Sequence, residues 1–143
     1  MASTFRVDFR AGLASVLTTY QAANPTLLNK VYSYPPGEYN TPCAFIEKTI
    51  NERQEMLNGV WQRILTGTVV IVCKLISNEQ ATNEQDVLID GLVDAYSTNF
   101  HAASGSSEIE PVSVTDTEIT AGEGVRYAAA IITVQGTKQE GRL

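Results

Sequence analysis

Asp86, Asp90 and Asp94 are the residues whose type and spacing most suggest chemistry, because steps of four place three carboxylates on one stripe of a helix. Carboxylate oxygens are ligands for hard cations such as Ca²⁺ and Mg²⁺. The sequence places no histidine or further acid to complete a metal site, so a solvated helix face is the favoured interpretation. The single histidine, His101, follows this segment and has no ligand partner near it in the sequence.

Catalytic motifs do not accompany these residues. The sequence contains no phosphate loop, dinucleotide fingerprint, nucleophile elbow or metalloprotease motif. A Ser-His-Asp triad would need His101, and Ser104-Gly105-Ser106 is typical of a connector. A glycosidase-type carboxylate pair stays open, since acids distant in sequence can converge in space. Cys43 and Cys73 are predicted to be small packed hydrophobic residues on opposite faces. We therefore expect no catalytic residue, metal or cofactor.

Charge divides the chain into unlike parts. Residues 75–125 hold ten acids and no Lys or Arg, whereas residues 1–74 hold seven bases and five acids, within a net charge of −6. Tight binding of nucleic acid needs clustered Lys and Arg, which this distribution does not offer. It does permit head-to-tail pairing of copies, with an acidic surface against a basic one.

Length and composition predict one domain over residues 1–143. The hydrophobic content of 43% is that of an ordinary globular protein, and 143 residues can bury a sizeable core. No apolar run approaches the ~20 residues of a membrane span, and the N-terminus lacks a signal-peptide core. We therefore expect a cytoplasmic site of synthesis and no membrane partner.

A long β-hairpin over residues 43–76 is the central structural prediction. Asn58-Gly59 lies between two strand-like runs, and a type I′ turn needs positive φ at both positions. A two-residue turn pairs residues whose numbers sum to 117, which places Ile46 opposite Ile71. The core face then holds Ala44, Ile46, Ile50, Met56, Trp61, Leu65, Val69, Ile71, Cys73 and Leu75. The second face, too apolar for bare solvent, holds Cys43, Phe45, Val70, Val72 and Ile76. A bulge at Gly67 would exchange the faces beyond it.

The hairpin tip is a candidate contact site. Residues 51–55 and the strand opposite them are polar, so the outer half of the hairpin is predicted to project beyond the sheet. This would expose Met56, Leu57, Val60 and Trp61, and exposed apolar residues on a projecting tip indicate a binding surface. In the alternative interpretation the tip folds back and Trp61 is ordinary core.

The remaining elements complete an α+β fold. Helical spacing of Phe9, Leu13 and Leu17 predicts a first helix over residues 5–23. A strand over residues 27–34 follows and ends at Pro35-Pro36-Gly37. The capping box Thr82-Asn83-Glu84-Gln85 predicts a second helix over residues 82–100, with Val87 in its buried stripe. Strands over residues 109–119 and 125–137 come last, and residues 136–143 read as a flexible tail. The expected architecture is an antiparallel or mixed sheet with a long hairpin and two helices on one face.

The order of these elements resembles the tail terminator (tail completion) proteins of long-tailed bacteriophages. The resemblance spans nearly the whole chain and includes the Pro-Pro-Gly step and the helix that begins Thr82-Asn83-Glu84-Gln85. It implies a hexameric ring that caps the tail tube, stops tube polymerisation and offers a docking surface for the filled head. The implied location is the head–tail neck of the virion, after assembly in the host cytoplasm. The implied partners are further copies, the major tail tube protein and a head–tail connector or head-completion protein, with DNA only passing through the lumen.

Two surfaces follow as hypotheses. The interface hypothesis takes in Arg53, Met56, Leu57, Trp61, Arg63, Phe45, Val70 and Val72. The acidic-lumen hypothesis takes in Asp86, Asp90 and Asp94, since an acidic lumen would repel DNA phosphates. Two other functions stay open: another ring protein of the head–tail neck, such as a head-completion protein, and a small non-viral cytoplasmic binding module.

Overall fold

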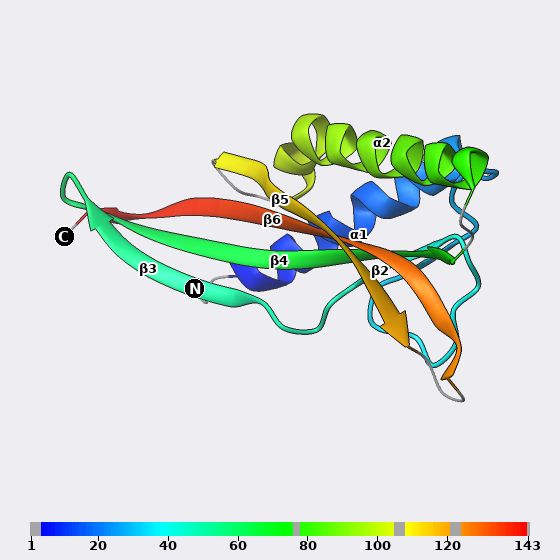
Figure 1. The fold of residues 1–143 in the computed structure, drawn as a ribbon. Coiled ribbons are helices and arrows are strands. Elements are labelled where there is room, and N and C mark those ends of the chain that lie inside the picture. Colours follow the sequence, from blue (N-terminus) through cyan, green and yellow to red (C-terminus); the bar gives the residue numbers. More distant parts are fainter. Residues whose placement is uncertain (1–3, 76–77, 105–107, 121–123, 143) are drawn as a thin grey trace.

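Two helices cover one face of a mixed six-stranded sheet (Figure 1). The structure, a computed structural model, describes residues 4–75, 78–104, 108–120 and 124–142. The elements in chain order are α1 (Phe5–Ala23), β1 (Lys30–Tyr32), β2 (Cys43–Ile46), β3 (Asn51–Leu57), β4 (Val60–Lys74), α2 (Glu79–Ser104), β5 (Glu108–Thr120) and β6 (Arg126–Arg142). The sheet order is β1-β2-β4-β6-β5, with β3 also paired to β4. Only β1 and β2 run parallel, and all other strand pairs are antiparallel. The predicted α+β class, a mixed sheet with both helices on one face, is confirmed.

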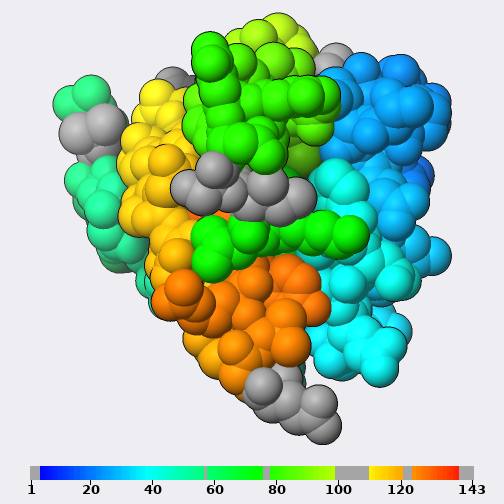
Figure 2. Space-filling view, turned by 45° about the vertical axis from the view of Figure 1, so that its right-hand side comes forward, coloured from blue at the N-terminus to red at the C-terminus, as the bar shows by residue number. Residues whose placement is uncertain are grey.

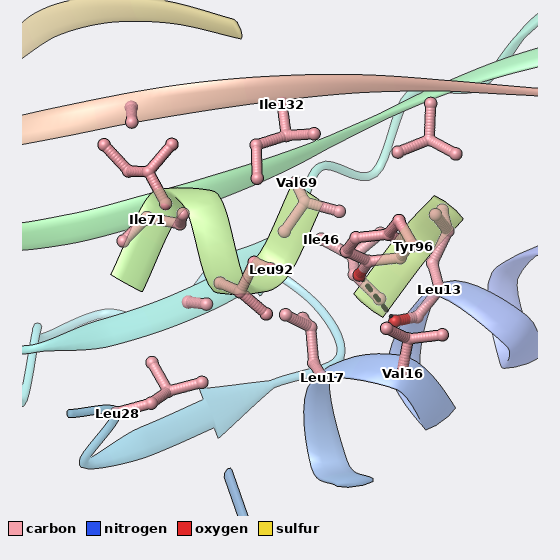
Figure 3. Close-up of a cluster of buried hydrophobic side chains, with 14 of the residues drawn as sticks. Leu13, Val16, Leu17, Leu28, Ile46, Val69, Ile71, Leu92, Tyr96 and Ile132 are labelled. Carbon is pink, nitrogen blue, oxygen red and sulfur yellow. Dashed lines mark hydrogen bonds between the residues drawn. The ribbon is translucent and has the colours of Figure 1, made fainter. Parts of the chain in front are cut away.

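The main core lies between the helices and the sheet. Helix α1 buries Phe9, Leu13 and Leu17, the stripe predicted from their spacing. Helix α2 contributes Leu92 and the fully buried Tyr96, whose hydroxyl donates a hydrogen bond to the Leu13 carbonyl at 2.8 Å. Figure 3 shows Leu13, Leu17, Leu92 and Tyr96 in one cluster with Val69, Ile71 and Ile132 of the sheet. Burial of large apolar side chains, each worth about 1.5–3 kcal/mol, holds the two layers together.

Helix α2 begins earlier than the capping box predicted. Its first residue is Glu79, and the Asn78 side chain accepts a hydrogen bond from the Ala81 backbone N–H at 2.8 Å. Asn78 therefore takes the capping role that we expected of Thr82. The expected buried stripe is also corrected at Val87, which is 55% exposed.

The first strand is shorter than predicted. The backbone N–H groups of Leu27 and Leu28 both donate to the Asn24 carbonyl, at 3.2 and 3.1 Å, in a turn after α1. Because these groups are committed to the turn, pairing with β2 begins only at Lys30.

The hairpin has the predicted turn but is interrupted on one arm. Asn58 and Gly59 have φ of 55° and 76°, and pairs such as Met56–Trp61 sum to 117 as expected. Beyond Asn51–Thr66, four residues (47–50) face only two, so Ile46 pairs with Val69 and the predicted pair with Ile71 is wrong. The offset is even, and side chains alternate with period 2, so the predicted faces survive.

Gly67 does not form the bulge that we considered. Strand β4 runs through it in continuous register with Val134 of β6. A Cβ at Gly67 would lie 2.9 Å from side-chain atoms of both Phe9 and Leu13. Glycine is needed there because helix α1 approaches the strand closely.

Strand β6 extends far beyond its predicted end. It pairs with β4 from Tyr127–Lys74 to Arg142–Val60, with one irregularity beside Trp61. Residues 136–142, expected to form a flexible tail, are therefore part of a paired strand, and that prediction is corrected. Their sequence is polar because this part of the strand lies outside the main core.

Candidate functional site

The hairpin tip presents an exposed apolar pair. Met56 and Trp61 face each other across the turn, with exposed fractions of 45% and 36%. The alternative in which Trp61 belongs to the core is therefore contradicted. The side chain of Leu57, which we also assigned to the interface, lies outside the described side chains. An apolar pair held open on a rigid turn is the arrangement expected of a protein-binding site.

Three strands carry this tip away from the helices. Val60 pairs with Leu57 of β3 on one side and with Arg142 of β6 on the other. Figure 1 shows the ribbon of β3, β4 and β6 reaching past the start of α1. We call this part, residues 51–66 with 135–142, the projecting ribbon. A three-stranded ribbon keeps a defined direction better than an isolated hairpin would, because two strands alone are only marginally stable in water.

Glu52 anchors the base of the projecting ribbon to helix α1. Its carboxylate accepts two hydrogen bonds from the Arg63 guanidinium, at 3.1 and 3.0 Å, and one from Arg6 at 3.0 Å. The Gln54 amide donates a further bond at 2.8 Å. These donors, the Arg63 guanidinium foremost, lower the pKa of Glu52 to about 2. Arg6 lies in the first turn of α1, so the cluster ties the helix to strands β3 and β4.

The two arginines of the interface hypothesis differ in availability. The Arg63 side chain is only 18% exposed, bonds Glu52, and places its guanidinium carbon 5.4 Å from the centre of the Phe5 ring. Arg63 thus serves the internal anchor. Arg53 is 65% exposed, with Nε 3.7 Å from the Glu55 carboxylate, an exposed pair that contributes little to stability. Arg53 therefore remains open to a partner.

The second face of the sheet is covered within the chain, which corrects the interface hypothesis. Phe45, Val70 and Val72 are 4%, 2% and 0% exposed. The Tyr39 ring stacks on Phe45 with centroids 6.0 Å apart and meets Tyr127 edge-on at 5.2 Å. Both predicted helices were assigned to the other face, so we expected no intramolecular cover here, whereas the folded loop returns Tyr39 to the sheet.

Asp86, Asp90 and Asp94 all lie exposed on helix α2. This fits a solvated helix face, as their spacing indicated. Within the residues that the structure describes, no group of three or more His, Cys, Asp or Glu side chains could hold a metal ion. The backbone of His101 belongs to α2 rather than following it, and its side chain lies outside the described side chains.

A cavity that sequence reasoning missed lies where α2 begins. It encloses about 390 Å³ and is lined by Leu27, Pro42, Cys73, Lys74, Gln85 and Leu88 among others. Figure 2 views the molecule from this side, with the start of α2 above the end of β4. Burial raises the pKa of the Cys73 thiol to about 11, so this thiol stays protonated and is a poor nucleophile near neutral pH. The lining comes from four separate segments, and no local sequence signal could have brought them together.

Two comparisons of the sequence with known proteins found no match. No family model matches the chain, and no curated protein sequence matches it. Among the described residues, none of the helices combines the length and apolar character needed to cross a membrane.

Proposed function

We propose that this chain is a tail terminator subunit of a long-tailed bacteriophage. In this role it forms a ring, hexameric by the resemblance, that caps the tail tube, ends tube polymerisation and receives the head. The observation that carries the proposal is the projecting ribbon, anchored at Glu52 and open at Met56 and Trp61. A ring protein that must grip a neighbouring copy or the tube needs a rigid apolar contact beyond its own core, and the ribbon supplies one.

Further support comes from the arrangement of the whole chain. The order helix, short strand, hairpin, helix and two strands agrees with the resemblance along nearly its full length. The proposed partners are further copies of the chain, the major tail tube protein and a head–tail connector or head-completion protein. The proposed location is the head–tail neck of the virion. DNA only passes through the lumen of the proposed ring.

The decisive experiment adds the purified chain to its cognate tube protein during polymerisation. We expect shorter tubes of narrower length distribution, with a ring at one end, in electron micrographs. Tubes of unchanged length without a terminal ring would refute the proposal. A ring that binds connector protein but leaves tube length unchanged would instead identify a head-completion protein.

Replacing Met56 and Trp61 at the hairpin tip tests the observation on which the proposal rests. Met56→Ala with Trp61→Ala should abolish tube capping while shifting the free energy of unfolding by less than about 1 kcal/mol, since both side chains are exposed. The matched control is Val7→Ala with Val125→Ala, two residues that are 68% and 48% exposed away from the tip. A destabilisation of about 3–5 kcal/mol in the tip variant would mean that Trp61 is core after all.

A further inference from the structure

The fold turns the charge division of the sequence into two unlike sides. Sheet order places β5 at one edge and β1 at the other, with α2 packed on β5 and β6 and α1 packed on β1, β2 and β4. Strand β5 lies beside α2 in both Figure 1 and Figure 2. We define the acidic side by five of the exposed carboxylates on α2 and β5, namely Asp86, Asp90, Asp94, Asp116 and Glu118. Of these, Glu118 has Arg126 of β6 at 3.6 Å.

Exposed bases gather at the opposite edge. We define the basic side by Lys30 on β1, Lys48 in the connection between β2 and β3, and Arg53 on β3. Glu52, an acid of the same region, is already neutralised by Arg6 and Arg63. Glu55 is paired only loosely with Arg53, at 3.7 Å between exposed groups. Glu47, next to Lys48, is half-buried, so Lys30, Lys48 and Arg53 leave this edge with a small net positive charge that can meet the acidic side.

Strand β5 has an open edge on the acidic side. One edge pairs with β6 along its length, and no other described strand pairs with the second edge. Val112 and Val114 on this strand are 53% and 42% exposed. Pro111 and the register shift before Ser113 interrupt the edge only near its start, so residues 113–120 keep a regular, unpaired edge. Such edges are ready to pair with another chain unless they are blocked.

We propose that the open edge of β5 and the adjoining acidic side of α2 dock onto the basic side of a second copy of this chain. Charge complementarity selects a copy as the occupant, because each molecule carries both surfaces. The two surfaces lie at opposite edges of one sheet and cannot meet within a molecule. Contact between them is head-to-tail and closes a ring when the rotation between copies allows it. The inference rests on the proposed function, since it names the surfaces through which ring subunits meet. It assigns Asp86, Asp90 and Asp94 to a contact between copies, in place of the lumen that we first considered for them.

Charge reversal tests the pairing. One variant, Asp94→Lys with Asp116→Lys, removes most of the net negative charge of the acidic side, and a second, Lys48→Glu with Arg53→Glu, makes the basic side acidic. Each variant alone should self-associate at least about tenfold more weakly than the wild type in light scattering across a concentration series. An equimolar mixture should recover association, because native and doubly reversed contacts then alternate. Wild-type association should also weaken as salt rises.

The control variant, Asp8→Lys with Glu38→Lys, changes the net charge equally at exposed acids outside the acidic side and should associate like the wild type. A wild type that stays monomeric at every concentration overturns the inference. Undiminished association of either reversed variant, or no recovery on mixing, does so too. The length of the tail tubes distinguishes a failure of this inference from a failure of the proposed function. If the wild type shortens tubes and reversal changes nothing, only the docking surface is wrong. If reversal and mixing behave as expected but tube length never changes, only the tail terminator function is wrong.

Discussion

Glu52 joins the projecting ribbon to helix α1 through the hydrogen bonds that its carboxylate accepts. It is 17% exposed and bonded by Arg6, Arg63 and Gln54, which come from α1, β4 and β3. Arg63 and Lys138 also lie over the Phe5 ring, at 5.4 and 5.8 Å, so positive charge and an aromatic face reinforce the same junction. Loss of the carboxylate should therefore loosen the ribbon as well as lower stability.

Glu52→Gln should lower the free energy of unfolding by about 1–2 kcal/mol near pH 7, because charge-assisted bonds to two guanidinium groups are lost. The folded pKa of Glu52, about 2, lies below the ordinary value of 4.5. A lowered pKa stabilises the fold above the unfolded value, and this stabilisation disappears as pH falls from about 4.5 toward 2. Urea unfolding of both proteins across that range should show their difference shrinking.

Glu55→Gln is the matched control for that series. Glu55 lies on the same strand, but it is 46% exposed and forms a surface ion pair with Arg53 at 3.7 Å. Such pairs contribute little, so its replacement should change the free energy of unfolding by less than about 0.5 kcal/mol. A difference between wild type and Glu52→Gln that stays constant down to pH 2 would show that the carboxylate charge is not what stabilises the junction.

At the scale of elements, the close approach of α1 to β4 depends on Gly67. Gly67→Ala should destabilise the protein by about 1–3 kcal/mol, because the new methyl group would press on Phe9 and Leu13, both fully buried. Thermal or chemical unfolding measures the loss. Gly37→Ala is the control, since nothing lies within 4 Å of a Cβ there and its stability should be unchanged or slightly raised. Equal stability of the two variants would mean that the helix can move away from the strand without cost.

At the scale of the whole molecule, the C-terminal part of β6 is the third strand of the projecting ribbon and pairs there with β4. A chain that stops after Thr137 loses the pairs from Arg63–Lys138 to Val60–Arg142. Amide hydrogen exchange at residues 60–63 should then speed up by at least about tenfold, as expected for a locally opened strand. Exchange at Val69 and Ile71 should not change, because their partners Ile132 and Ala130 remain. Unaltered exchange at residues 60–63 would mean that β3 alone holds the ribbon.

The two proposals also meet at this scale. The open tip, with Met56 and Trp61, and the two charged sides are different surfaces of one molecule. A ring subunit needs contacts to copies on both sides and contacts to partners above and below. The tip variant and the charge-reversed variants therefore test separate surfaces, and a chain defective in only one should show only one loss.

Local sequence patterns were enough to predict the parts of the fold that depend on near neighbours. Asn58-Gly59 predicts its turn because few other residues adopt positive φ at two successive positions. The stripe of Phe9, Leu13 and Leu17 predicts α1 through its spacing alone. The two faces of β4 from Leu65 to Cys73 were also predicted correctly, and so was the exposure of Met56 and Trp61 at the tip, whereas Leu75, assigned to the core face, is 41% exposed.

Tertiary structure decided what depends on residues far apart in the chain. Residues 136–142 look like a polar tail, yet pairing with β4 extends β6 through them. Phe45, Val70 and Val72 look unpartnered until the folded loop brings Tyr39 onto them. The exposed acids of α2 and β5, such as Asp94 and Asp116, become one side of the molecule only because α2 packs beside β5. Period and turn geometry are short-range properties, whereas strand partners and surface neighbours are set by which distant segments the core brings together.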